Sequence, residues 1–368
     1  MRARSQRVSL RQHSLPHMND LSWPNAGRER AFHDWLLGVA SSHALHTDSL
    51  RLASADASFR RYLRIDSAAG SHVIMDAPPD LENNTAFVQV AQLMRDAGVR
   101  VPEVLAHDEA HGFLLLSDLG ERTLLQALPL PEAELHQHFM AALDALVRWQ
   151  QASTPGVLPP YDHAVLMREM ALFQDWYIAQ HKGLSLNEAD TAQLLQVQTL
   201  IAQQVAQAPQ VYVHRDFMPR NLLLDAQGRL GLVDFQDALY GPVTYDIASL
   251  MRDAFHSWDD ERVMDVTIRY WERVRRQAWF AHEDWDRDFG AFMRAVDWMA
   301  LQRHLKILGI FARLSLRDGK VQYLADTPRF VLYVREVCAR YRELTPLLRL
   351  IDRIEGLEAA SGYAFGRS

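Results

Sequence analysis

The segment 211–237 constrains the fold of this chain more than any other part of it. Two short apolar runs, residues 221–225 and 230–233, flank the turn Ala226-Gln227-Gly228 and predict a β-hairpin. His214-Arg215-Asp216 stands just before this hairpin, Asn221 opens it, and Asp234 follows it. A carboxylate, an amide and a second carboxylate are therefore expected on loops at the two ends of one rigid ribbon.

This combination of side chains indicates phosphoryl transfer, in which a protein contributes positioning and charge neutralisation through Mg²⁺ bound to hard oxygen ligands. We expect Asp216 to accept the proton of the attacking hydroxyl, and Asn221 and Asp234 to bind the Mg²⁺. A lone His-x-Asp would be weak evidence, and two polar surface loops are the alternative interpretation. Here H-x-D-x-x-x-x-N is followed by Val-Asp-Phe, with Asp234 thirteen residues after Asn221, which makes the pattern specific.

The phrases HRDFMPRN (214–221) and VDFQD (233–237) resemble the catalytic and metal-binding segments of the aminoglycoside phosphotransferase and choline kinase superfamily. The phrases ASFRRY (57–62), MDAPP (75–79) and QRHLK (302–306) narrow the resemblance further. They are similar to the bacterial anomeric kinases that phosphorylate C1 of N-acetylmuramate and N-acetylglucosamine in peptidoglycan recycling. The resemblance covers about residues 27 to 341. It implies ATP and Mg²⁺ as cofactors and a small-molecule amino sugar as substrate.

The resemblance also implies a fold of the α+β class, two-lobed and protein-kinase-like. We expect a small N-lobe with a five-stranded antiparallel sheet and a larger, mainly helical C-lobe. The nucleotide-binding lobe would span residues 20–118 and the catalytic and substrate-binding lobe 119–368. Residues 1–19 carry scattered Arg, Ser and His without an apolar period or the apolar core of a signal peptide, and predict a disordered extension.

Charge and composition exclude several other classes of protein. A formal net charge of −7 argues against a nucleic-acid-binding protein, which would need a basic patch. The single cysteine, Cys338, excludes an intrachain disulfide and a cysteine-based zinc site, and favours a reducing cytoplasm. No apolar run approaches the length that spans a membrane. We therefore expect a cytoplasmic protein that binds neither nucleic acid nor membrane, and we expect a monomer.

The nucleotide site is expected to depart from the usual kinase pattern. The turn between the first two strands, residues 55–58, contains no glycine, so its backbone and the Ser58 hydroxyl would face the phosphates. No lysine occurs before Lys182, so the usual pair between a strand lysine and a helix glutamate cannot form. Arg60 or Arg61 would replace the lysine, since a guanidinium suits phosphate oxygens. Either arginine would otherwise be a solvated strand residue.

The segment Ser117-Asp118-Leu119 resembles the hinge between the lobes of a kinase, where adenine hydrogen-bonds to backbone groups. Arg220, four residues after Asp216, would stabilise charge on the transferred phosphoryl group. Alternatively, Arg220 pairs with Asp234 or Asp237 as part of the scaffold. Asp246 resembles a structural aspartate that hydrogen-bonds the catalytic loop.

The acceptor site is expected on a helix near the C-terminus. Arg303 and Lys306 share a helical face at i, i+3 and would bind an anionic group such as the lactyl carboxylate of N-acetylmuramate. His304 would hydrogen-bond a sugar hydroxyl. A solvated basic edge is the alternative interpretation of all three residues. Trp176 and Tyr177 would stack on the pyranose ring, although aromatic residues at helical spacing are more often part of a core.

Two rival functions remain open at the level of sequence. The first is a kinase for another small hydroxyl compound, such as an aminoglycoside or choline. A cationic acceptor needs an acidic pocket, and the basic segment 303–306 favours an anionic or neutral sugar instead. The second rival is a nucleotide-binding pseudokinase scaffold, which would account for the missing lysine and glycines. The joint presence of Asp216, Asn221 and Asp234 argues against it.

Overall fold

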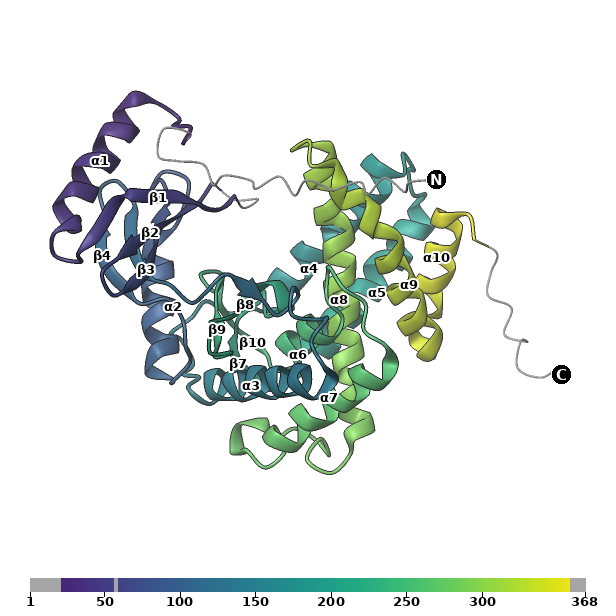
Figure 1. Cartoon of the computed structure of the whole chain (residues 1–368). Coiled ribbons are helices and arrows are strands. Elements are labelled where there is room, and N and C mark those ends of the chain that lie inside the picture. Colours follow the sequence, from purple (N-terminus) through teal and green to yellow (C-terminus); the bar gives the residue numbers. More distant parts are fainter. Residues whose placement is uncertain (1–20, 56–58, 358–368) are drawn as a thin grey trace, which may run out of the picture. The chain divides into compact units, whose positions relative to one another are not determined.

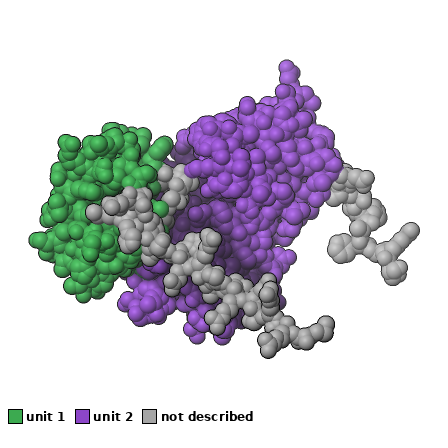
Figure 2. Space-filling view, turned by 45° about the horizontal axis from the view of Figure 1, so that its top comes forward, with its two compact units in different colours: residues 1–92, 101–119 green, residues 93–100, 120–368 purple. Residues whose placement is uncertain are grey.

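The computed structural model describes residues 21–55 and 59–357, which form two compact units (Figures 1 and 2). The smaller unit holds the described residues up to 92 together with 101–119, and the larger unit holds 93–100 and the described residues from 120 onward. Residues 1–19, for which we expect disorder, and Ser58 are outside the described part of the chain.

As predicted, the smaller unit is built on a five-stranded antiparallel sheet, and its strand order is β1-β2-β3-β5-β4. Its strands are β1 (Leu45–Ala55), β2 (Arg61–Ser67), β3 (Gly70–Asp76), β4 (Val104–Asp108) and β5 (Phe113–Ser117). Leu63 pairs with Ile74, and Ile74 pairs with Leu115, so apolar side chains line up across three strands. Helix α1 (Ala26–Ala40) packs on this row through Phe32 and Leu36 and closes the core of the unit.

Helix α1 begins at the N-cap Asn25, whose side chain accepts a hydrogen bond of 2.9 Å from the amide of Arg28. The guanidinium of Arg28 binds the carboxylate of Asp76 at the end of β3. The helix is therefore tied to the sheet by an ion pair as well as by its apolar stripe. Helix α2 (Asn84–Asp96) follows β3 along the chain.

The larger unit is mainly helical (Figure 1). Its α-helices are α3 (Glu132–Gln151), α4 (His163–Leu172), α5 (Glu188–Ala206), α6 (Thr244–Met251), α7 (Asp260–Val274), α8 (Phe289–Leu316), α9 (Thr327–Arg340) and α10 (Thr345–Glu355). A π-helix, η2 (Phe173–His181), continues α4. None of the described helices is both long enough and apolar enough to cross a membrane.

The predicted hairpin is confirmed as β8 (Leu222–Leu224) and β9 (Leu230–Leu232), with Leu222 opposite Leu232. The two-residue strand β6 (Arg122–Thr123) joins β8 on its other side. A second pair of strands is formed by β7 (Gln210–Val213) and β10 (Leu239–Pro242). These two strands directly precede and follow residues 214–238, the catalytic segment, which contains the proposed catalytic and metal-binding residues. These extra strands escape prediction because two to four residues are too few to show a period. Both ends of the segment 214–238 are therefore anchored by backbone pairing.

Helix α8 is the longest described helix and packs against α4, η2, α6 and α9. Its backbone lies close to α4 at Gly309. A Cβ atom added there would lie 2.3 Å from the carbonyl carbon of Leu172, the last residue of α4. A side chain at this position would collide with backbone, which cannot move aside as a flexible side chain can.

The variant Gly309→Ala should therefore lower the free energy of unfolding by about 1–3 kcal/mol, the usual cost of overpacking. Gly38→Ala is the matched control, because Gly38 is also helical but has open space around its Cβ position. That change should raise stability by roughly 0.5–1 kcal/mol through helix propensity. Urea unfolding of both variants tests the packing, and an unchanged or increased stability of Gly309→Ala would contradict it.

Candidate active site

The catalytic segment is positioned entirely by elements of the larger unit. Strand β7 leads into His214-Arg215-Asp216, and a 3-10 turn, η3 (Pro219–Asn221), carries the chain into the β8–β9 hairpin. The hairpin returns the chain to Asp234 beside this turn, since the amide of Val233 donates to the carbonyl of Asn221 over 3.1 Å. Residues far apart along the segment are thus brought side by side.

The structure brings Asp216, Asn221 and Asp234 together. The Asn221 side-chain amide Nδ2 donates to the backbone carbonyl of Asp216 at 2.9 Å and to Oδ2 of Asp234 at 3.3 Å. Asn221 is buried, whereas Asp216 and Asp234 are half-buried. Both bonds engage the nitrogen of Asn221, so its side-chain oxygen Oδ1 remains available as an acceptor.

These residues fit the metal that the sequence predicts. The side chains of Asn221 and Asp234 supply neutral and anionic oxygen atoms, the ligand type that Mg²⁺ prefers. Gln236 donates to Oδ1 of Asp234 at 2.9 Å and orients this carboxylate. In the described part of the chain, no group of three or more His, Cys, Asp and Glu could hold a metal. A metal here would therefore complete its shell with phosphate oxygens and water, as Mg²⁺ commonly does.

The loop that carries Asp216 is held by Asp246, as expected from the resemblance. Asp246 has no exposed surface and accepts hydrogen bonds from the amides of His214 and Arg215, at 2.8 and 3.1 Å. Burial raises the pKa of Asp246 to about 7, although these two bonds act to lower it. Burial also lowers the pKa of His214 to about 3, so its imidazole is neutral. The supporting role of Asp246 is confirmed.

Two residues of this site have a left-handed backbone without being glycine. Arg215 has φ 74° and Asp234 has φ 66°. Such conformations cost on the order of 1–3 kcal/mol each and persist only where the surroundings hold them. Arg215 is next to Asp216, the proposed base, and Asp234 is a proposed metal ligand. The backbone strain is therefore located at the candidate active site.

Arg220 is exposed, and its guanidinium lies 4.4 Å from the ring centre of Phe255. Among the described residues no ion pair joins Arg220 to Asp234 or Asp237, so the alternative scaffold role is not observed. A cation–π contact holds one face of the guanidinium and leaves its N–H groups at the edge for an anion.

On the nucleotide side, the structure separates the two candidate arginines. Arg61 is a scaffold residue, because its guanidinium binds Asp76 at 2.6 Å and lies 3.9 Å from the Trp23 ring centre. Of the two alternatives, the structure therefore favours Arg60 for the phosphate role, which stays a prediction. Arg60 is nearly buried and pairs with Glu82, with 2.8 Å between Nη2 and Oε2. An arginine–glutamate pair is thus present although the usual lysine–glutamate pair cannot form; Arg60 directly precedes β2, and Glu82 lies two residues before α2.

The segment 117–119 is occupied largely by contacts within its own unit. The amide of Ser117 donates to the carbonyl of Glu103 at 2.9 Å, so this N–H is not available to adenine. The Asp118 carboxylate binds Nε of Arg64 at 2.6 Å and the Ser71 hydroxyl at 2.7 Å. Contacts of adenine with the backbone of Asp118 and Leu119 stay a prediction.

On the acceptor side, the structure corrects the expected roles of α8. His304 is fully buried, stacks on Tyr333 at 4.9 Å between ring centres and cannot reach a sugar hydroxyl. Arg303 is also buried, with its guanidinium 5.0 Å from the ring centre of Tyr245. Lys306 lies 2.9 Å from Oε1 of Glu169. Arg303 and Lys306 do share a helical face, but that face meets protein, because the helices around α8 cover it.

The two aromatic residues on η2 that were expected to stack on the sugar, Trp176 and Tyr177, differ in their burial. Tyr177 is buried and donates its hydroxyl to Glu355 at 2.8 Å, so it does not stack on a sugar. Trp176 is half-buried, and its stacking role stays a prediction.

Sequence reasoning missed Glu169 and underrated Glu82. A pattern in the sequence could have identified Glu169 as a buried charge, because it shares the apolar face of α4 with Leu166 and Met170.

Comparison with known proteins shows what this chain is similar to. A model of the phosphotransferase enzyme family matches residues 49–287. An N-acetylmuramate/N-acetylglucosamine kinase of Pseudomonas aeruginosa is 48% identical over 308 residues, covering 83% of this chain and 89% of that protein. The protein of the same name from Neisseria meningitidis serogroup B is 45% identical, covering 86% and 94%. Among solved structures, choline kinase LicA from Streptococcus pneumoniae superimposes with a TM-score of 0.58 at 12% identity, covering 85% and 100%.

Proposed function

This chain belongs to the phosphotransferase enzyme family, and from this premise we propose that it is an ATP-dependent kinase for amino sugars. The substrate would be N-acetylmuramate, N-acetylglucosamine or both, phosphorylated at the anomeric C1 hydroxyl. The observation that carries this proposal is the 45–48% identity to kinases named for these two sugars. The assembled set of Asp216, Asn221 and Asp234 supports it independently. The reaction would belong to peptidoglycan recycling in the cytoplasm.

In this proposal Asp216 orients the C1 hydroxyl and accepts its proton. The sugar oxygen forms a bond to the γ-phosphorus while the bond between that phosphorus and the ADP oxygen breaks. An anomeric hydroxyl is more acidic than other sugar hydroxyls, so a carboxylate is an adequate base. Asn221 and Asp234 would hold the divalent metal, which we propose is Mg²⁺. When bound, the metal would neutralise phosphate charge. Arg220 would add a further positive charge beside the transferred group.

We further propose that the Arg60–Glu82 pair replaces the missing lysine–glutamate pair. Glu82 accepts a hydrogen bond of 3.1 Å from the amide of Phe59 as well as pairing with Arg60. The Glu82 carboxylate therefore holds both the Arg60 guanidinium and the backbone amide of Phe59. A charge-assisted pair of this kind suits the recognition of phosphate oxygens.

The variant Arg60→Met should lower kcat/KM for ATP by about 10- to 100-fold, the equivalent of one hydrogen bond to a charged group. Arg61→Met is the matched control, since it also removes an arginine–carboxylate ion pair, but one that joins β2 to β3 within the smaller unit. Arg61→Met should lower the melting temperature and leave the KM for ATP unchanged. Steady-state kinetics at varied ATP decide the question, and equal KM values in the two variants would sink the assignment of Arg60.

Phosphorus NMR tests the function itself. Purified protein is incubated with ATP, Mg²⁺ and each amino sugar in turn, with choline and an aminoglycoside as cationic alternatives. The expected result is a new proton-coupled phosphate resonance of a C1 sugar phosphate, accompanied by ADP. Turnover with a cationic acceptor and none with the sugars would overturn the amino-sugar proposal. ATP left intact with every acceptor would favour a pseudokinase.

A further inference from the structure

The carboxylate of Glu169 on α4 binds four side chains from three parts of the larger unit: the segment before α4, the loop before Asp216, and α8. Its Oε1 accepts from Nη2 of Arg215 at 2.7 Å and lies 2.9 Å from Nζ of Lys306. Its Oε2 accepts from the hydroxyl of Tyr161 and from Nε2 of Gln302 at 3.3 Å. Only 10% of the side chain is exposed. A single carboxylate thus links α4 to the catalytic loop and to α8.

The charge of Glu169 is retained despite this burial. Burial acts to raise the pKa of Glu169, but Lys306 and Arg215 together lower it to about 2. A buried carboxylate that lost one of its partners would leave an uncompensated charge, which proteins tolerate poorly. The Glu169 carboxylate and its two cationic partners, Arg215 and Lys306, therefore stabilise one another.

Arg215 immediately precedes Asp216 and is bound at its backbone and at its guanidinium, which also donates a longer bond of 3.4 Å to the carbonyl of Asp237. Its amide donates to Asp246 at 3.1 Å, and its guanidinium is bound by Glu169. Between these two anchors its backbone has a left-handed φ of 74°. A non-glycine residue keeps such a conformation only when its surroundings over-determine it. The Glu169 contact is one of these determinants, and the position of Asp216 depends on them.

We infer that Glu169 is a positioning residue for the proposed base: through Arg215 it holds the catalytic loop in the conformation that presents Asp216. This inference rests on the proposed phosphoryl transfer for its kinetic consequence, but its structural part stands by itself. Glu169 would not touch substrate. Lys306, expected at the sequence level to bind the acceptor, would instead provide the second cation that keeps Glu169 charged.

The test begins with Glu169→Gln, which preserves shape but removes the charge. Hydrogen exchange of the His214 and Arg215 amides should become faster by about tenfold or more, because these amides report opening of the loop. At a temperature well below unfolding, kcat should fall by about 10- to 100-fold, the effect of a small misplacement of a catalytic group. The KM for ATP should stay within about twofold, since substrate binding is not altered.

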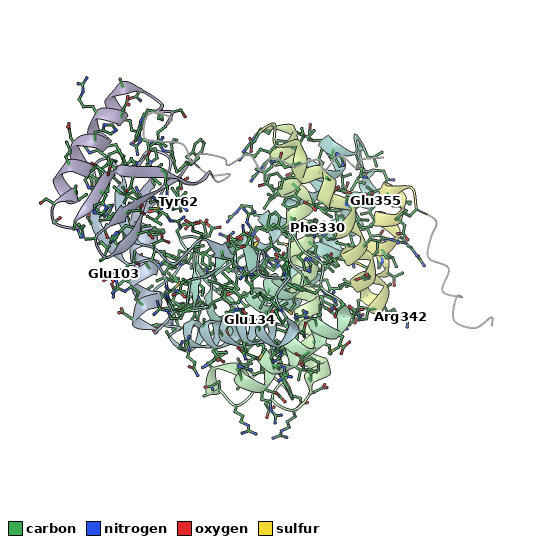
Figure 3. All side chains as sticks on the ribbon, in the orientation of Figure 1. Tyr62, Glu103, Glu134, Phe330, Arg342 and Glu355 are labelled. Carbon is green, nitrogen blue, oxygen red and sulfur yellow. The ribbon has the colours of Figure 1, made fainter. Side chains whose placement is uncertain are left out.

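Glu355 on α10, labelled in Figure 3, provides a matched control. Its carboxylate also binds one tyrosine hydroxyl and one lysine, from Tyr177 at 2.8 Å and Lys182 at 2.7 Å. It differs from Glu169 in having no recorded contact with the catalytic loop among the described residues. Glu355→Gln should lower the melting temperature while loop exchange and kcat remain at the wild-type values.

Arg215→Met removes the other partner of the same ion pair and leaves Glu169 paired with Lys306. It should reproduce the faster exchange at His214 and the loss in kcat. The double variant should then lose no more kcat than Arg215→Met alone, because both changes remove one link. Losses in kcat that add would overturn the inference, as would wild-type exchange at His214 in both single variants. The exchange result is independent of which acceptor the wild-type enzyme phosphorylates, so failure of the proposed function is distinguishable.

Discussion

Replacement of Asp216 by asparagine should lower kcat by about 10²- to 10⁴-fold, the range that a general base typically contributes. Asparagine has nearly the same shape but cannot accept the hydroxyl proton. The loop should keep its conformation, because the bond from Asn221 goes to the backbone carbonyl of Asp216, which the substitution preserves. A coupled assay of ADP release with a saturating amino sugar measures the loss.

Asp237 provides a control for the removal of a carboxylate from the same segment. It is exposed and lies three residues after Asp234. The variant Asp237→Asn should have wild-type kcat and should melt within about 2 °C of the wild type, since isolated surface changes have small effects on stability. Full turnover by Asp216→Asn would show that another group takes the proton.

Replacement of Asp234 by asparagine should lower kcat/KM by about 10³-fold and move half-maximal activity to higher Mg²⁺ concentration. A bound metal supplies several kcal/mol of charge stabilisation, and asparagine lacks the negative charge that binds it. The backbone should tolerate this change well, because asparagine adopts the left-handed conformation, φ 66°, that residue 234 requires. The loss would therefore report on the ligand and not on the loop.

Metal binding can be measured separately from turnover. Binding of Mn²⁺ to the protein with a non-hydrolysable ATP analogue, followed by electron paramagnetic resonance, should weaken strongly in Asp234→Asn. Asp225→Asn serves as the control, since Asp225 is a carboxylate at the turn of the same hairpin and pairs with Arg229 and Arg100. Equal Mn²⁺ affinity in the two variants would exclude Asp234 as a metal ligand.

The sequence predicted that α8 is a helix but did not reveal that its charged side chains are buried. The spacing of Arg303 and Lys306 correctly puts them on one face. Whether that face meets solvent depends on Tyr245 and Glu169, which lie on other helices and are remote in the chain. A charge run is usually solvated, but here α8 is surrounded by helices, so its charged side chains find protein partners.

The antiparallel sheet and the hairpin were predicted because their signals are local. Alternation along a strand and a glycine turn between two apolar runs depend on neighbours only a few residues away. The exact strand bounds were less accurate, and the expected lobe limits and adenine contacts stay predictions. The short strands β6, β7 and β10 are instead decided by pairing with partners elsewhere in the chain.

The sequence by itself determined the chemistry that we propose for this protein, because Asp216, Asn221 and Asp234 lie within one segment whose turn and strand pairing are local. Only the tertiary structure decided which charged residues support that chemistry. Arg60 forms an ion pair with Glu82, and Arg215 with Glu169, and the partners are 22 and 46 residues apart in the sequence. The reason is physical: a buried charge is stable only beside its opposite, and which opposite lies within reach is set by the packing of whole helices and strands.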